Sequence, residues 1–207
     1  MRARMALTKI DLTIELREIL LRERPPQIYA ISPKGTVPVL HLPDGQVIDE
    51  SVDILHWVFN QIEDSNDISN QVQLVDLIDG EFKHWLDRYK YSERYPEHSQ
   101  FYYQERGNEI LTEFENKLGE NSFFGGKSPG FTDMAVFPLI RQFAHVNVDA
   151  YQESFTRLYD YYRDMHAHIC FTSVMDKYSQ WQEGDTPLLV NFYVPENTEK
   201  LTQQTPL

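Results

Sequence analysis

The stretch SPKGTVPVLHLPDGQVIDES, residues 32–51, contains two short apolar runs around a turn and ends at a helix start. TVPVLHL (36–42) and QVI (46–48) flank Pro-Asp-Gly, which is a composition typical of a β-turn. Pro38 lies inside the first run, although a proline removes a backbone donor from a sheet. Taken alone, that proline fits an edge strand or a bulge.

The residues on either side of this stretch extend it to a small α/β unit. TIELREI (13–19) alternates apolar and polar residues, as a half-buried strand does. RERPPQIYAIS (22–32) predicts a short helix with a proline near its first turn. DESVDILHWVFNQI (49–62) has the apolar spacing of a helix that is buried on most of one side. We therefore predict a first domain of α/β type over residues 1–62.

The chain changes character after the polar stretch EDSNDISNQ (63–71), because the strand signal nearly disappears. Turn-forming residues separate the apolar segments that follow, and those segments have helical spacing. The predicted helices are 72–94, 98–118, 132–146 and 154–178. The pattern indicates a linker near 63–70 and an all-α second domain over 70–207.

The charge of the chain excludes several kinds of partner. The formal net charge is −13, with 7 Lys and Arg against 8 Asp and Glu in residues 1–62 and 12 against 24 in the remainder. Binding to nucleic acid or to an anionic membrane needs clustered cations, so we expect neither. No apolar run approaches the roughly 20 residues that a membrane-spanning helix needs.

Metal and disulfide chemistry are also not expected. Cys170 is the single cysteine, which excludes an internal disulfide and a multi-thiolate metal site. The histidines do not form an HExxH motif, and His166 and His168 are spaced to face different sides of a helix. We expect no bound metal and a location in the reducing cytoplasm.

The quoted stretch resembles the glutathione S-transferase superfamily, whose pattern is NPKG-x-VPVL, a turn, and ESxxIxxWL. GGKSPGFTDMAVFPLIRQFAHV (125–146) is similar to the sixth helix of bacterial members close to the omega-like and glutaredoxin-like classes. The resemblance therefore touches both halves of the chain. It implies an α/β + all-α fold, in which a thioredoxin-like N-terminal domain, here partial, precedes an all-helical C-terminal domain.

The resemblance also implies a binding site for glutathione. A cis peptide bond between Val37 and Pro38 would leave the backbone N–H and C=O of Val37 free for the cysteinyl residue of the ligand. Arg24 would bind the glycine carboxylate, with Arg22 and Lys34 as neighbours able to replace it.

The helix start supplies the other end of this implied site. Ser51 would take the γ-glutamyl carboxylate and Glu50 the amine, although both residue types are also ordinary helix caps. Phe82, Trp85 and Tyr89 follow one another at helical spacing and either line a second-substrate cleft or form core.

Asp133 resembles the aspartate with which the family begins its sixth helix. The residue three positions earlier is Gly130 instead of Ser or Thr, so only half of a capping box is available. We interpret Asp133 as a folding residue.

The resemblance starts inside the first helix of the family, at MRARMAL (1–7). The family's first strand and its loop with Cys-Pro-Tyr, Ser or Tyr have no counterpart, so we assign no catalytic residue. Cys170, Tyr29 and Ser32 lie on other segments and do not replace it. We expect either a longer product that begins upstream or a natural truncation. Without that strand, the edges of segments 13–19 and 36–42 would be unpaired.

Two functions remain open. The first is an enzyme that transfers glutathione to a small electrophile or exchanges it with a mixed disulfide, with its catalytic residue outside this chain. The second is a non-catalytic scaffold that binds a protein partner. The resemblance also implies a homodimer, in which the near-neutral first domain contacts the acidic second domain of the other subunit.

Overall fold

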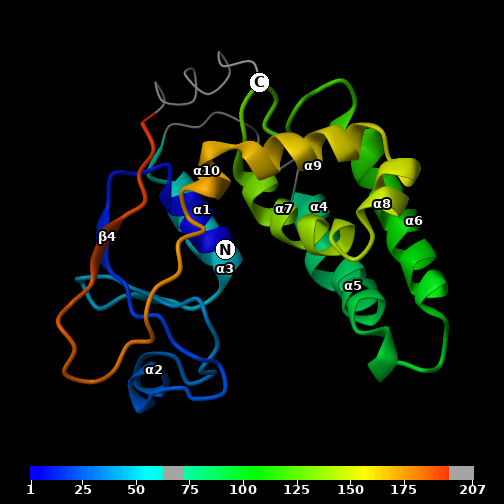
Figure 1. Cartoon of the computed structure of the whole chain (residues 1–207). Helices are drawn as coiled ribbons and strands as arrows, with labels where there is room; N and C mark the ends of the chain where they lie inside the picture. Colours follow the sequence, from blue (N-terminus) through cyan, green and yellow to red (C-terminus); the bar gives the residue numbers. More distant parts are fainter. Residues whose placement is uncertain (63–71, 196–207) are drawn as a thin grey trace. The chain divides into compact units, whose positions relative to one another are not determined.

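The computed structural model describes residues 1–62 and 72–195, which form two compact units (Figure 1). The first unit comprises Met1–Asp64 and His168–Leu207, and the second comprises Ser65–Ala167. The segment from His168 on is thus grouped with the α/β unit, although its periodicity predicts a continuation of the helical domain. Within the described residues, no helix has the length and apolar character needed to cross a bilayer.

The first unit is a small α/β structure. Its elements are α1 (Arg2–Leu7), β1 (Thr13–Glu15), α2 (Pro26–Ile31), β2 (Leu40–His41), β3 (Val47–Ile48), α3 (Ser51–Phe59), α10 (Ile169–Thr172) and β4 (Leu189–Asn191). Helix α1 packs against α3 and also contacts α10. The core is built from their apolar faces, which include Met5, Ala6, Ile54, Leu55, Val58 and Phe171.

The predicted hairpin is confirmed, but its strands are short. β2 and β3 pair antiparallel around the Pro-Asp-Gly turn, with Leu40 opposite Ile48 and His41 opposite Val47. The predicted strands 36–42 and 13–19 are reduced to two and three residues. A strand is regular only where a neighbouring backbone forms hydrogen bonds with it. The apolar–polar alternation in the sequence therefore predicts strands longer than those that form.

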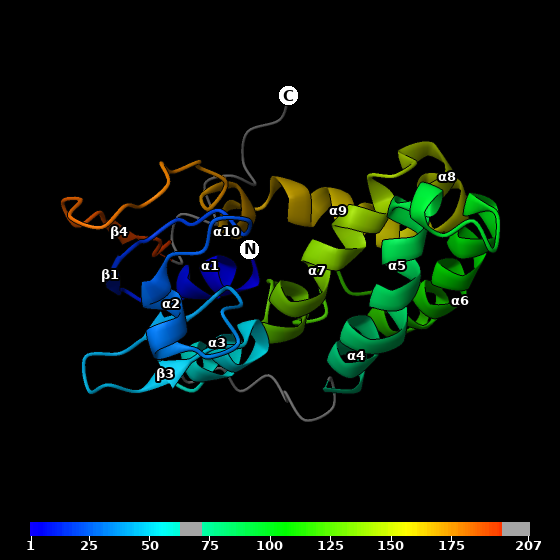
Figure 2. The same cartoon turned by 90° about the horizontal axis from the view of Figure 1, so that it is seen from below.

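The strand β4 pairs antiparallel with β1, and the two lie side by side in Figure 2. Ile14 lies opposite Val190, and two residues further on the backbone N–H of Leu16 donates to the C=O of Leu188 (2.8 Å). One edge of β1 is therefore paired with the C-terminal segment, although the sequence predicts unpaired edges on segments 13–19 and 36–42. The sequence predicts a helix over 154–178 and no strand after it, so β4 is not predicted.

A tryptophan strengthens the attachment of this segment. The backbone N–H of Trp181 donates to the C=O of Glu18 (2.7 Å), and the guanidinium of Arg17 lies 4.7 Å from the centre of the Trp181 ring. A cation over a tryptophan ring contributes about 0.5–1 kcal/mol at an exposed site. Trp181 therefore reports on whether the segment is docked.

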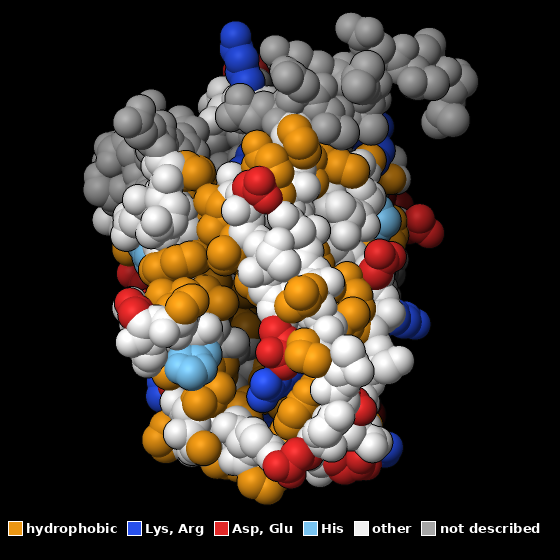
Figure 3. All heavy atoms as spheres, turned by 90° about the vertical axis from the view of Figure 1, so that its left-hand side faces the viewer, with side chains coloured by type: hydrophobic (Ala, Val, Ile, Leu, Met, Phe, Trp, Pro, Cys, Tyr) orange, Lys and Arg blue, Asp and Glu red, His pale blue; other side chains and the backbone are white. Residues whose placement is uncertain are grey.

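The side of the molecule that carries β4 is rich in exposed apolar side chains. Leu188, Leu189 and Tyr193 are 42%, 65% and 40% exposed, whereas Phe192 is buried. Figure 3 shows this side, where hydrophobic side chains gather around a shallow hollow. The alternation along β4 is that of a strand with one face on the core.

Replacing Val190 by proline should detach β4 from β1. The pairs Ile14–Val190 and Leu16–Leu188 have the same parity, so Val190 belongs to a hydrogen-bonded pair and its N–H points at β1. We expect the first unit to lose about 2–3 kcal/mol of unfolding free energy and Trp181 fluorescence to shift to the red. Urea denaturation followed by tryptophan fluorescence measures both effects.

Leu189→Pro is the matched control, because the N–H of Leu189 points away from β1 and its side chain is exposed. Equal losses of unfolding free energy in the two variants would show that the backbone hydrogen bonds between β1 and β4 do not hold the C-terminal segment in place.

The second unit is a helical bundle. Its elements are α4 (Val72–Leu77), the π-helical turn η2 (Ile78–Phe82), α5 (Lys83–Lys90), the 3₁₀ turn η3 (Ser92–Arg94), α6 (Gln100–Leu118), α7 (Phe131–Ala144), α8 (Val148–Ser154) and α9 (Arg157–Ala167). Helix α5 packs against α6 and α7, and α9 packs against α6 and α7. With the first unit, this bundle confirms the predicted α/β + all-α fold class.

Two details of the predicted helices are wrong. The helix predicted over 154–178 ends at Ala167, where His168 adopts an extended backbone before α10 begins. The connection expected near 147–153 instead contains α8, because the side chain of Asn147 accepts the N–H of Ala150 (3.1 Å) as an N-cap. Both boundaries depend on capping geometry, which apolar spacing does not report.

Asp133 is buried at the start of α7, the most completely buried helix described. Its Oδ1 accepts the N–H of Phe124 (2.9 Å), and its Oδ2 accepts those of Gly125 and Gly130 (2.8 Å each). The expected half of a capping box is present in the Gly130 bond. Burial raises the pKa of Asp133 to about 6, against the opposing effect of these N–H donors. The carboxylate ties a loop to the helix, which is a structural role.

Candidate functional site

The residues predicted to bind the cysteinyl part of glutathione lie in the loop before β2. The peptide bond between Val37 and Pro38 is cis, as the resemblance implies. Val37 is 44% exposed, and within the described residues its backbone N–H and C=O have no hydrogen-bond partner. These two groups can pair with an extended peptide as an added strand does.

The N-terminus of α3 is the second part of the site. The helix begins at Ser51, Glu50 is its N-cap, and no side chain caps the first turn. In the part of the chain that the structure describes, the half-buried hydroxyl of Ser51 makes no hydrogen bond. A helix start with a free hydroxyl and unsatisfied N–H groups is suited to a carboxylate.

Lys34 and two carboxylates adjoin this helix start. Lys34 Nζ donates to Glu50 Oε1 (2.7 Å) and lies 3.8 Å from Asp49 Oδ1, and Ser32 Oγ donates to Asp49 Oδ2 (2.9 Å). The hydrogen bond to Glu50, with the charge of Asp49, raises the pKa of Lys34. The carboxylate predicted to bind the ligand's amine is thus already bound to an ammonium group of the protein.

The sequence does not predict this ion pair. The resemblance implies Lys34 as a replacement for Arg24 at the glycine carboxylate, whereas the lysine lies at the start of α3 beside Glu50 and Asp49. Lys34 and Glu50 are 16 residues apart, so no helical or strand spacing links them. The sequence shows a cation in the loop and acidic residues at the helix start, which predicts that they attract each other but not which residues pair.

Arg24 is exposed before α2, and among the described residues it has no ion-pair or hydrogen-bond partner. Its neighbour Arg22 pairs with Glu23 (3.1 Å). Of these two arginines, Arg24 is the one whose guanidinium is available to a ligand carboxylate.

The side chains set aside as catalytic candidates have other surroundings. Cys170 is 1% exposed in α10, and the hydroxyl of Ser32 is bound to Asp49. Tyr29 lies on α2 with 47% of its surface exposed. We therefore assign a catalytic role to none of these three residues.

A shallow groove of about 380 Å³ runs beside α3. It shares Asp49 with the cluster around Lys34, but the predicted glutathione-binding residues do not line it. Its lining residues are Gln46, Val47, Ile48, Asp49, Asp53, His56, Trp57 and Asn60. Within the described ranges, no three His, Cys, Asp or Glu side chains gather as a metal site needs.

The aromatic residues predicted for a second-substrate cleft pack inside the helical unit. Phe82 and Tyr89 are buried against the ring of Phe143, with ring centres 5.4 Å and 4.7 Å away. Trp85 is half-buried and stacks on Tyr103 at 6.3 Å. Trp85 is therefore the member of this set that presents surface to a small molecule.

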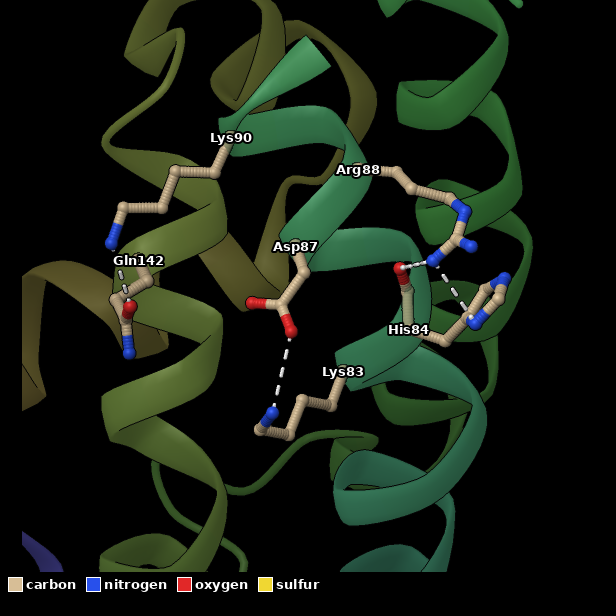
Figure 4. A network of polar contacts seen from close by, with 6 residues as sticks. All are labelled: Lys83, His84, Asp87, Arg88, Lys90 and Gln142. Atoms are coloured by element: carbon tan, nitrogen blue, oxygen red, sulfur yellow. Dashed lines mark hydrogen bonds and ion pairs between the residues drawn. The ribbon is translucent and has the colours of Figure 1, made fainter. Parts of the chain in front are cut away.

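The polar side of α5 is shown in Figure 4. Lys83 donates to Asp87 (3.3 Å) along the helix, and Lys90 reaches across to Gln142 on α7 (2.9 Å). Arg88 bonds to the ring nitrogen Nδ1 of His84 (3.1 Å). These contacts stabilise the helix and fix it to α7, which is a structural function.

Comparison with family models assigns both units. The model "Glutathione S-transferase, N-terminal domain" matches residues 1–66, and the model "Glutathione S-transferase, C-terminal domain" matches residues 70–168. The chain belongs to the glutathione S-transferase superfamily. A search among curated proteins gives no match.

Solved structures of this superfamily share the fold of the chain. The Tau class glutathione S-transferase from mango, Mangifera indica, is 18% identical with a TM-score of 0.70, over 85% of this chain and 87% of that one. A rice glutathione S-transferase in complex with glutathione is 20% identical with a TM-score of 0.69, over 83% and 82%. Glutathione transferase Omega 3C from Trametes versicolor is 14% identical with a TM-score of 0.68, over 86% and 85%.

Proposed function

We propose that this superfamily member binds glutathione in an extended conformation along the Val37–Pro38 segment, with its γ-glutamyl end at the start of α3. The observation that carries this proposal is the Ser51 hydroxyl, which makes no hydrogen bond within residues 1–62 and 72–195 and stands at an uncapped helix N-terminus beside the Glu50 carboxylate. The γ-glutamyl end carries a carboxylate and an ammonium on one carbon, which matches this pair of groups. Arg24 supplies the cation for the glycine carboxylate.

The reaction in this proposal is transfer of the glutathione thiolate. The sulfur attacks the carbon of a small electrophile and displaces its leaving group, or attacks a mixed disulfide and releases the other thiol. Of the three aromatic residues predicted for a second-substrate cleft, we propose the half-buried Trp85 as a contact for a small apolar molecule, whereas Phe82 and Tyr89 are buried in the helical unit. The thiol-activating group is not assigned to a residue of this chain.

A protein-binding scaffold without chemistry is the alternative function. Binding of glutathione without turnover of a chromogenic electrophile or of a mixed glutathione disulfide would favour it. We also propose the homodimer that the resemblance implies and the cytoplasmic location that the single cysteine favours.

Replacing Ser51 by alanine should weaken glutathione binding about tenfold or more, because a hydrogen bond to a charged group contributes roughly 1.5–3 kcal/mol. The hydroxyl makes no cap bond in the free protein, so the stability of the variant should stay close to that of the wild type. Isothermal titration calorimetry with glutathione measures the affinity, and thermal unfolding checks the fold.

Ser154→Ala is the control, since that serine bonds within α8 of the helical unit. If Ser51→Ala and Ser154→Ala bind glutathione as the wild type does, Ser51 is not a ligand and the proposed pose is wrong.

A further inference from the structure

The carboxylate of Glu50 has a partner before any ligand arrives. Lys34 Nζ lies 2.7 Å from Glu50 Oε1, and both side chains are more than half exposed. One carboxylate oxygen is thus occupied by an ammonium group at the position where the ligand's own ammonium is proposed to bind. Two ammonium groups at one carboxylate repel each other, so the two cannot share it at full strength.

We propose that Lys34 is an internal competitor for the ligand's amine: it holds Glu50 in the free protein and must release it when a ligand with an α-ammonium group binds. This inference rests on the proposed function. It makes Lys34 a residue that sets both the affinity for glutathione and the preference between ligands with and without an amine.

The surroundings of Lys34 give its ammonium a second place to go. Asp49 Oδ1 lies 3.8 Å from Nζ, and the other oxygen of Asp49 is held by the hydroxyl of Ser32. A flexible lysine can therefore move from Glu50 to Asp49 without losing an ionic partner. The competition is consequently modest, and we expect it to change the affinity about two- to fivefold, as exposed ion pairs do.

The same contacts argue against a direct role of Lys34 at the glycine carboxylate. Its ammonium already lies between two carboxylates at the start of α3, so binding a ligand carboxylate would require it to leave both. Arg24, by contrast, has no partner among the described residues.

Lys34→Met tests the proposal, because methionine keeps most of the length of the side chain and removes its charge. Calorimetry should show that the variant binds glutathione about two- to fivefold more tightly than the wild type does at low salt. The gain should be absent for the des-amino analogue glutaryl-cysteinyl-glycine, which has no ammonium group to compete. It should also shrink as salt screens the exposed pair.

Lys117→Met is the matched control, since it removes the same charge from an exposed position on α6 in the other unit. Unchanged glutathione affinity in Lys34→Met, or an equal gain for the des-amino analogue, would overturn the competition. Weaker binding of glutathione would instead make Lys34 a ligand and would also overturn it. If neither the wild type nor Lys34→Met binds glutathione at millimolar concentration, the proposed function itself fails, and the inference fails with it.

Discussion

Replacing Asp133 by alanine should lower the free energy of unfolding of the helical unit by about 4 kcal/mol. The carboxylate accepts the backbone N–H groups of Phe124, Gly125 and Gly130, and it is fully buried. Alanine leaves two buried donors and one part-buried donor unsatisfied, and each buried group costs roughly 1–3 kcal/mol. Urea denaturation followed by the fluorescence of Trp85, the tryptophan of this unit, measures the loss.

Asp149→Ala is the control, because Asp149 is an exposed aspartate in the first turn of α8. It should change the stability by no more than about 0.5 kcal/mol. If Asp133→Ala does not fold, Asp133→Asn retains an acceptor for part of the network and should show an intermediate loss. A loss below about 1 kcal/mol in Asp133→Ala would mean that the loop relaxes and finds other partners.

The stability of the wild type should depend on pH through the same carboxyl group. Burial raises the folded-state pKa of Asp133 from 3.8 to about 6, so between these values the folded protein binds more protons than the unfolded chain. Stability from this group is therefore present below pH 3.8 and is lost as pH rises toward 6. A shift of about 2 units corresponds to about 3 kcal/mol.

The difference in unfolding free energy between the wild type and Asp133→Asn isolates this effect, because the other carboxyl groups titrate in both proteins. We expect the difference to fall by about 2 kcal/mol between pH 4 and pH 6.5 in urea denaturation. A difference that rises over this range would mean that the three N–H donors outweigh burial and hold the pKa below its ordinary value.

Local sequence determined much of the fold. The Pro-Asp-Gly turn sets the register of the β2–β3 hairpin, because the turn and the alternation on each side of it lie within ten residues of one another. The start of α3 at Glu50 and Ser51 follows from a polar pair placed before an apolar helical pattern. These features involve neighbouring residues, whose preferences a sequence displays directly.

Part of the candidate site was predictable for the same reason. Val37 and Ser51 belong to motifs that could be matched position by position, and among the described residues the backbone groups of one and the hydroxyl of the other have no partner, while their role in binding stays a prediction. The pairing of Lys34 with Glu50 was not predictable, because it depends on how the loop before β2 folds onto α3.

The sequence by itself thus determined the α/β and helical elements, the hairpin and the helix start that carries Glu50 and Ser51. Only the tertiary structure decided that β4 pairs with β1 from the far end of the chain. The same holds for Asp133, whose carboxylate accepts backbone N–H groups of the loop before α7. The tertiary structure also decided that Phe82 and Tyr89 point into the core. Short-range spacing fixes which face of an element is apolar, whereas the partner that buries this face is selected by packing among distant segments.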